Sequence, residues 1–231
     1  MKPRVISILT LVVLCVSVAS ATNLIVNGGF ESGSLTGWSE FDQTGGSGSW
    51  FANNTTVSPL SGLPTVGPAS GSWYAQTDQT GPGSHALIQR FTVGGGGETL
   101  SFDMFVNDWA NVVVGCGGLD YTVSPTECGR VDILTANASP FDTGAGVVVN
   151  LYQGADPFAS NPNPYTHYNF ALSLPSGTYQ LRFAESDNQL FFNMGIDNVV
   201  LTPSVPEPGT MALLGSAVLG VAGLIRRKFL L

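Results

Sequence analysis

The stretch TYQLRFA, residues 178–184, alternates between polar and apolar side chains up to Phe183. In an extended chain successive side chains point to opposite faces, so Tyr179, Leu181 and Phe183 would share one face. This pattern is typical of a strand that covers one side of an antiparallel sandwich, with its apolar face on the core. The stretch therefore predicts a β-strand with one face buried.

The rest of the middle of the chain has the same character. The whole chain contains 29 glycines and 14 prolines, and between its two ends they interrupt short segments rich in Val, Phe, Tyr and Thr. Such segments predict strands rather than helices. The expected strands are 24–26, 38–41, 49–53, 72–77, 85–93, 98–107, 129–136, 147–153, 167–174, 178–186 and 190–201. The last two are expected to form a closing hairpin around the turn at 186–189. The sequence predicts an all-β, antiparallel β-sandwich over residues 22–203.

The first 21 residues have the pattern of an export signal. Two basic residues within Met1–Arg4 precede the apolar run Val5–Val18, and small residues follow at 19–21. The run is too short to span a bilayer comfortably. We expect a signal peptide over residues 1–21, handled by the Sec translocon and cut by signal peptidase after Ala21. An uncleaved N-terminal membrane anchor is the alternative.

A second targeting pattern closes the chain. Pro206-Glu207-Pro208 precedes an uncharged run over 209–225, and basic residues follow at 226–228. The run is at the short end of what spans a bilayer as a helix. Basic residues directly after a membrane helix hold that end in the cytoplasm, which would place residues 22–205 outside. A plain C-terminal anchor is the alternative, although it would not require the prolines.

This tail resembles the PEP-CTERM sorting signal, which combines a Pro-Glu-Pro motif, a transmembrane helix and an Arg-rich end. The matching residues are Pro206, Glu207, Pro208, Arg226 and Arg227, within a tail over 204–231. The resemblance implies processing by an exosortase, a membrane cysteine transpeptidase, after transient anchoring in the inner membrane. It also implies a final place at the cell surface, in the outer envelope or in the extracellular matrix of a bacterium that makes exopolysaccharide.

The charge of the segment between the two ends excludes one class of partner. Residues 22–205 contain three arginines and 15 acidic residues, which gives a net charge of −12. So acidic a surface repels phosphate backbones and makes nucleic acid an unsuitable partner. It suits solubility, divalent cations or a hydrated matrix.

Two cysteines, Cys116 and Cys128, remain once the signal peptide is removed. In an oxidising compartment they are expected to form a disulfide that closes a Gly-rich loop, worth about 3 kcal/mol of stability. A metal site would need more ligands than two thiols, and no nearby histidine supplies them.

A second resemblance extends across the middle segment. The motif NLIVNGGFE at 23–31, with Gly37-Trp38, resembles the opening strand of galactose-binding-like jelly rolls, which include many carbohydrate-binding modules. IDNVVL at 196–201 resembles their last strand, and 100–107 fits a central one. The resemblance implies a jelly roll with a structural Ca²⁺ near its first and last strands, held by Glu31 and Asp197. Alternatively, these two carboxylates only cap turns.

Catalytic signatures are largely missing. No Gly-x-Ser-x-Gly occurs, and His85 and His167 lie in contexts that favour structural or surface roles over catalysis. Two histidines and one cysteine pair are too few for a zinc or copper centre. Carboxylate pairs for glycoside hydrolysis stay open, because spacing along strands does not reveal which pairs lie close together. We expect a protein that is not an enzyme.

Sugar binding is the main alternative to a purely structural role. Long loops on a β-scaffold often bind ligands, and two are expected here, at 108–127 and 154–166. Trp109 lies at the edge of the first loop beside Asp108, so its ring could stack on a sugar while the carboxylate binds hydroxyls. A packing role for Trp109 is the other interpretation.

Overall fold

The computed structural model describes residues 22–110, 116, 118–154, 161–204, 215 and 217. Within this range, residues Thr22–Ser204 form one compact unit with its own hydrophobic core, so the fragment 22–204 has what an independently folding domain needs. The expected signal peptide, the Pro-Glu-Pro motif and the basic end lie outside the described residues. None of the helical residues that are described belongs to a helix long and apolar enough to cross a membrane.

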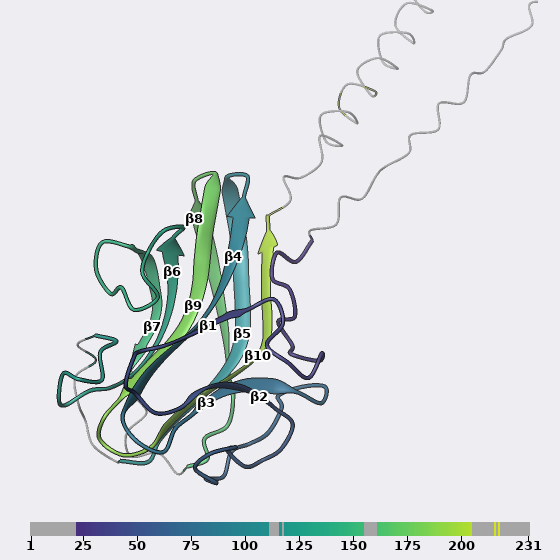
Figure 1. Ribbon diagram of the computed structural model, residues 1–231. Coiled ribbons are helices and arrows are strands. Elements are labelled where there is room, and N and C mark those ends of the chain that lie inside the picture. Colours follow the sequence, from purple (N-terminus) through teal and green to yellow (C-terminus); the bar gives the residue numbers. More distant parts are fainter. Residues whose placement is uncertain are drawn as a thin grey trace, which may run out of the picture. The chain divides into compact units, whose positions relative to one another are not determined.

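Two antiparallel sheets of five strands each are packed face to face (Figure 1). The strands are β1 (Ser39–Asp42), β2 (Ser49–Asn53), β3 (Tyr74–Asp78), β4 (Gly83–Val93), β5 (Gly96–Asp108), β6 (Glu127–Thr135), β7 (Val147–Gly154), β8 (Thr166–Leu174), β9 (Gly177–Asp187) and β10 (Phe192–Pro203). The first sheet has the order β1-β4-β9-β6-β7 and the second β2-β3-β10-β5-β8. We call them sheet A and sheet B. The prediction of an all-β, antiparallel sandwich is confirmed.

One expected strand does not form. Residues 24–26 run beside the end of β10, where the Leu24 N–H donates to the Leu201 carbonyl at 2.8 Å. They do not continue as a strand because side chains take the neighbouring hydrogen bonds. The Asn23 side chain accepts from the Ile25 N–H, and the Gln89 side chain accepts from the Val26 N–H.

The expected closing hairpin is also wrong. β9 lies between β4 and β6 in sheet A, whereas β10 lies between β3 and β5 in sheet B. The short connection between them therefore crosses from one sheet to the other. Both strands still direct their apolar sides into one core, which is why the alternation in each sequence resembles that of a hairpin.

Aromatic side chains from both sheets meet in the core. The Phe102 ring from sheet B packs edge-on against Phe183 from sheet A, with ring centroids 5.1 Å apart. Trp38 contacts Phe183 with centroids 6.0 Å apart. Burial of each such side chain stabilises the fold by roughly 1.5–3 kcal/mol. The core thus fixes the two sheets and positions the loops at the ends of the strands.

The outer face of β9 is buried as well. Gln180 and Arg182 lie on this polar face, yet they are 5% and 0% exposed. The loop at 136–146 covers them, and Gln180 donates to the carbonyl oxygens of Thr135 and Ala138 at 3.0 and 3.2 Å. The strand therefore has two buried faces, one apolar and one polar.

Candidate functional site

The two carboxylates expected to bind calcium are brought together by one loop, residues 69–73. Asp197 Oδ2 accepts hydrogen bonds from the Ala69 and Ser70 N–H groups, both at 3.0 Å. Glu31 Oε1 accepts from the Ser72 and Trp73 N–H groups at 2.9 and 3.0 Å. The first and last parts of the domain thus hold the two ends of the same loop.

The backbone around these carboxylates is unusual. The non-glycine residues with positive φ in the described part of the chain are Asn27 (53°), Phe30 (56°) and Asn198 (53°); the last two are adjacent to Glu31 and Asp197 in sequence, and Asn27 lies four residues before Glu31. Each such residue costs of order 1–3 kcal/mol, so surrounding contacts must hold it in place. At Gly71, with φ of 60°, a Cβ would lie 2.3 Å from Glu31 Oε1. The loop therefore needs glycine there.

Asn27 stabilises the turn that follows the opening motif. Its side-chain Nδ2 donates to the Ser34 and Thr36 carbonyl oxygens at 2.9 and 3.0 Å. Its own carbonyl accepts from Trp38 Nε1 at 3.2 Å. These bonds close the turn that follows the opening motif and tie it to the core.

The donor set at Glu31 and Asp197 can be compared with what Ca²⁺ requires. The ion takes six to eight oxygens from carboxylates, carbonyls and water. Each of the four carboxylate oxygens here already accepts at least one backbone N–H, but Asp197 Oδ1 and Glu31 Oε2 accept only one each from the residues that the structure describes. Since a carboxylate oxygen can accept two bonds, one oxygen of each residue stays available. No third Asp, Glu, His or Cys joins them in a metal-binding group among the described residues.

Burial raises the pKa of the Asp197 carboxyl, while the N–H groups of Ser70, Asn198 and Ala69 lower it. These three backbone donors favour the charged form and offset part of the cost of removing the carboxylate from water. Asp197 is thus held in the way expected of a carboxylate that caps a loop or binds a cation.

The two residues expected to bind a ligand lie at the end of β5. Asp108 is fully buried, and its Oδ1 accepts from the Ala110 N–H at 2.8 Å. Trp109 is half-buried, and its backbone N–H donates to the Phe191 carbonyl at 3.0 Å. The Asp108 carboxyl therefore faces the interior rather than solvent, and the indole Nε1 of Trp109 is buried as well, without a hydrogen-bond partner among the described residues.

A group of buried acids is a feature that the sequence analysis missed. Five fully buried carboxyls come from the ends of strands in both sheets, near the connection from β9 to β10: Asp78, Asp108, Glu127, Glu185 and Asp187. We call them the acidic cluster. Glu127 pairs with Asp187 across β6 and β9. Because each of these acids lies at or near the end of a strand, in sequence it resembles an exposed turn residue.

Neutral polar side chains hold part of the acidic cluster. Thr77 Oγ1 donates to Glu185 Oε2 at 2.7 Å, and Gln79 Nε2 donates to Asp187 Oδ2 at 2.8 Å. Glu127 is held by another acid: its carboxyl makes a side-chain hydrogen bond with the carboxyl of Asp108, which favours the protonated form of Glu127. No ion pair to a cation is found for the cluster in this part of the chain.

The pKa values of these acids follow from this environment. Burial, together with the neighbouring Asp108 and Asp187 carboxyls, raises the pKa of Glu127 to about 9. Burial also raises the pKa of Glu185 well above its ordinary value, and Asp187 shifts in the same direction. Glu127 therefore carries a proton at neutral pH, and burial shifts Glu185 in the same direction.

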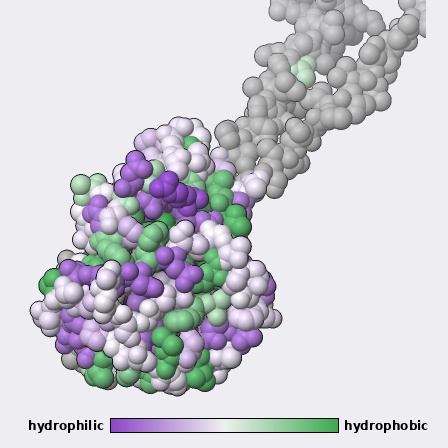
Figure 2. Space-filling model, in the orientation of Figure 1, coloured by the Kyte–Doolittle hydropathy of each residue, from purple (hydrophilic) through white to green (hydrophobic). Residues whose placement is uncertain are grey.

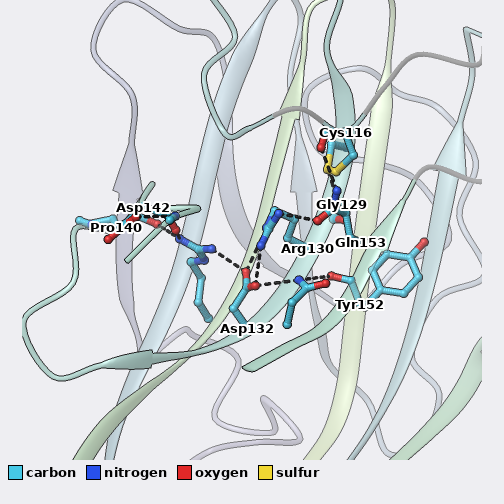
Figure 3. Close-up of polar contacts among 12 residues, drawn as sticks. Cys116, Gly129, Arg130, Asp132, Pro140, Asp142, Tyr152 and Gln153 are labelled. Carbon is cyan, nitrogen blue, oxygen red and sulfur yellow. Dashed lines mark hydrogen bonds and ion pairs between the residues drawn. A yellow bond between two sulfur atoms is a disulfide. The ribbon is translucent and has the colours of Figure 1, made fainter. Parts of the chain in front are cut away.

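A second polar network, on the outer face of sheet A, is built from arginines (Figure 3). Asp132 Oδ1 lies 2.8 Å from Arg130 Nη2, and Asp132 Oδ2 lies 2.5 Å from Arg182 Nη2. Arg182 Nη1 also donates to the Pro140 and Asp142 carbonyl oxygens at 2.8 and 2.7 Å. Through these bonds two strands, β6 and β9, and the 136–146 loop are held to one buried carboxylate.

The same network reaches the disulfide. Arg130 Nη1 donates to Gln153 Oε1 at 2.6 Å, and Gln153 Nε2 donates to the Cys116 carbonyl at 2.8 Å. The structure joins Cys116 to Cys128 by a disulfide, with Cα atoms 4.9 Å apart. The disulfide and the network together tie Cys116 to sheet A.

The two histidines each contact an aspartate. His85 is buried, with Nδ1 2.7 Å from Asp42 Oδ1 and Nε2 2.9 Å from the Ser47 carbonyl. His167 Nδ1 lies 2.7 Å from Asp103 Oδ1, and its side chain is 62% exposed. Both ring nitrogens of His85 are thus engaged in structural contacts, and His167 lies on the surface.

Two shallow cavities accompany the loops on sheet A. One, of about 410 Å³, is lined by Leu119, Val123 and Phe141 together with polar groups. The other, of about 470 Å³, has Phe41 beside Arg90. Neither Asp108 nor Trp109 is among the described residues that line them. On the face shown in Figure 2, hydrophobic and hydrophilic residues are interspersed, and no broad apolar patch is seen.

Comparison with solved structures identifies proteins that share the sandwich. The K3 cleaved adhesin domain of Lys-gingipain from Porphyromonas gingivalis W83 is 19% identical, with a TM-score of 0.51, and the alignment covers 80% of this chain and 100% of that one. The module TmCBM61, solved with β-1,4-galactotriose, is 12% identical, with a TM-score of 0.47 and coverage of 78% and 97%. At such identities the likeness extends to the fold alone.

Sequence comparison identifies the end of the chain. No curated protein matches this chain. Residues 204–228 match the PEP-CTERM protein-sorting motif, at the place where the tail was expected. The chain therefore carries a PEP-CTERM sorting motif behind a β-sandwich domain, which implies an exported surface protein that an exosortase processes.

Proposed function

We propose that residues 22–204 form a non-catalytic domain that serves as a structural component of the cell surface or of the extracellular polysaccharide matrix. One observation carries this proposal: the sorting motif begins at Ser204, directly after β10 ends at Pro203. All ten strands precede the motif, so removal of the tail would leave the sandwich complete. A domain of this kind can stay folded after processing and act outside the cell.

The chemistry of the domain supports a structural role. Its net charge of −12 favours hydration and contact with cation-bridged polymers over contact with other polyanions. The polar groups that are buried in it mostly hold loops and strands together, as Arg182 and Asp132 do. Of the two histidines, His85 uses both ring nitrogens in such contacts.

A carbohydrate-binding module with a defined glycan ligand is the second candidate. The half-buried residue Trp109 at the end of β5 favours it, because an indole that is partly exposed can stack on a sugar face. The burial of Asp108 weakens it, since that carboxylate does not face solvent. An extracellular hydrolase is a third and weaker candidate.

Two measurements test the structural role. In the producing bacterium we expect the mature domain, without its tail, to fractionate with the matrix or envelope, and to stay in the inner membrane when the exosortase is deleted. In a glycan array, the purified 22–204 fragment should show no saturable binding to any soluble glycan. Tight, saturable binding that Trp109→Ala abolishes would instead establish the carbohydrate-binding module. Trp73→Ala serves as a matched control, because Trp73 packs beside the core at another place.

We also propose that Glu31 and Asp197 hold a structural Ca²⁺. Support comes from their convergence on the 69–73 loop, and from the single hydrogen bond accepted by Glu31 Oε2 and by Asp197 Oδ1. The ion would supply charge neutralisation to two carboxylates at the meeting point of the first and last parts of the domain. Glu31 and Asp197 would provide the acidic ligands, and neighbouring carbonyl groups the rest.

We expect Ca²⁺ to raise the melting temperature of the 22–204 fragment and EDTA to reverse the effect. At a Ca²⁺ concentration a hundredfold above the dissociation constant, binding adds about 2.7 kcal/mol of stability. The double variant E31Q/D197N should lose this response, whereas D120N, on a loop elsewhere, should keep it. If Ca²⁺ leaves the melting temperature of the native fragment unchanged, the two carboxylates act only as caps of the loop.

A further inference from the structure

The four edge strands of the sandwich are not equally protected. An exposed edge strand presents unpaired N–H and C=O groups to any other strand, and proteins usually block this with short strands, charges, prolines or bulges. β1 has only four residues, and two of them are Glu40 and Asp42; β2 has five. β7 is longer, but its register with β6 is interrupted at two places. Three edges therefore carry a protective feature.

The fourth edge, β8, carries none of these features. It pairs with β5 without interruption over nine residue pairs, from Gly96↔Leu174 to Met104↔Thr166. Its sequence THYNFALSL contains no Asp, Glu, Lys, Arg or Pro. For residues 169–173, no backbone hydrogen bond outside the β5 ladder is found within the described part of the chain. β8 is thus a long and regular edge strand of sheet B, and no described strand pairs with its outer side.

We propose that β8 is an association edge, at which a second copy of this domain adds its own β8 in antiparallel orientation. Sheet B would then continue across the two copies as one sheet. The backbone supplies the attraction, because each strand offers the donors and acceptors that the other lacks. This inference concerns assembly and goes beyond the proposed structural role.

Charge favours a second copy as the occupant. Two domains of net charge −12 repel one another over most of their surface, and β8 is a segment from which acidic residues are absent. Asn169, Ala171 and Ser173 are exposed, small and neutral on its outer face. Two copies can therefore approach here without setting carboxylates against each other. Added salt should strengthen the contact, since it screens the remaining repulsion.

The sequence of β8 is also self-complementary in one register. When two antiparallel copies are centred on Phe170, that ring faces its counterpart, and aromatic pairs across strands are favourable. Asn169 then lies opposite Ala171 of the second copy. His167 lies opposite Ser173, so no two histidines meet even when they are protonated. Every cross-strand pair in this register is free of like charges.

Sedimentation velocity of the 22–204 fragment over a concentration series tests the proposal. We expect a reversible monomer–dimer equilibrium for the native fragment, tightened by salt. The variant N169E/A171E sets a glutamate opposite a glutamate twice and should weaken dimerisation at least tenfold. The variant N169K/A171E sets a lysine opposite a glutamate twice and should restore it. Because both side chains are exposed, the melting temperature of the monomer should change little.

The double variant V123E/V148E is the matched control. It adds the same charge at two exposed positions outside the β8 strand, one on the 118–126 loop and one on β7, and should leave the dimer intact. A native fragment that stays monomeric at every concentration and salt level would overturn the proposal. So would a dimer that N169E/A171E does not weaken. If N169K/A171E and N169E/A171E weaken the dimer equally, pairing of two β8 strands in this register is refuted.

Discussion

We expect the 22–204 fragment to unfold at a higher temperature at pH 5 than at pH 8. A protein whose carboxylates are paired with cationic side chains shows the opposite dependence on pH. The cause is the acidic cluster. Burial and neighbouring carboxyls raise the pKa of Glu127 from 4.5 to about 9, and burial raises that of Glu185 well above its ordinary value. These carboxyls are protonated in the folded domain over a range of pH in which the unfolded chain has already lost the protons.

The direction of this pH dependence of stability follows from proton linkage. A carboxyl whose pKa is higher in the folded state contributes stability that is present below the unfolded value of 4.5 and is lost as pH rises towards the folded value. The loss is about 1.4 kcal/mol per pH unit for each such group. For Glu127 alone, the change from pH 5 to pH 8 approaches about 4 kcal/mol, and Glu185 acts in the same direction. Thermal unfolding at a series of pH values measures it.

Glu127→Gln should remove a large part of this pH dependence. Glutamine has the same shape and stays neutral, and its amide group can donate a hydrogen bond to the Asp108 carboxylate beside it. We expect the variant to melt at a higher temperature than the native fragment at pH 8 and at nearly the same temperature at pH 5. Calorimetry at the two pH values is the measurement.

Asp120→Asn is the matched control for Glu127→Gln. Hydrogen bonds from Gln43 and Thr122 lower the pKa of Asp120, so its removal should not raise the melting temperature at pH 8. A native fragment that becomes more stable from pH 5 to pH 8 would show that the acidic cluster is ionised in the folded domain. The same conclusion would follow if Glu127→Gln destabilises the domain at pH 8.

The architecture was largely predictable because the strands alternate so regularly. In the segment 178–184, Leu181 and Phe183 point into the core as their spacing indicates, and both are fully buried. Periodicity shows which side of a strand is apolar, but not which sheet the strand joins. The assignment of β9 and β10 to one hairpin failed for this reason. Pairing depends on contacts between distant parts of the chain that a short sequence pattern does not contain.

The polar interior could not have been predicted in the same way. Glu127 and Asp187 are of residue types that are common in exposed turns, and Arg182 lies on the polar side of an alternating strand. Their burial results from loops that fold back over the outer faces and from the meeting of strand ends in both sheets. By contrast, Glu31 and Asp197 lie in motifs that open and close the domain, and both accept hydrogen bonds from the 69–73 loop.

The contact between Asp132 and two arginines should give the largest single-residue effect on the outer face of sheet A. Asp132 and Arg182 are fully buried and Arg130 is 5% exposed, so their charges are removed from water. One carboxylate faces two guanidinium groups, and Asn150 Nδ2 donates to Asp132 Oδ1 at 2.7 Å as well. Burial lowers the pKa of Arg182, and the Asp132 carboxylate acts against that shift. The Asp132 carboxylate supplies the countercharge for the two buried guanidinium groups.

Asp132→Asn should therefore destabilise the 22–204 fragment by about 3–5 kcal/mol, because it leaves two buried guanidinium groups without a countercharge. Urea denaturation under non-reducing conditions measures the loss. Arg90→Gln is the matched control: Arg90 is exposed and makes one hydrogen bond, to the Ala136 carbonyl, so its removal should cost under about 1 kcal/mol. The double variant D132L/R182M, which replaces the pair by apolar groups, should recover part of the stability that Asp132→Asn loses. Equal stability of the native fragment and Asp132→Asn would mean that the arginines are solvated, and that the 136–146 loop does not seal this face of the sheet.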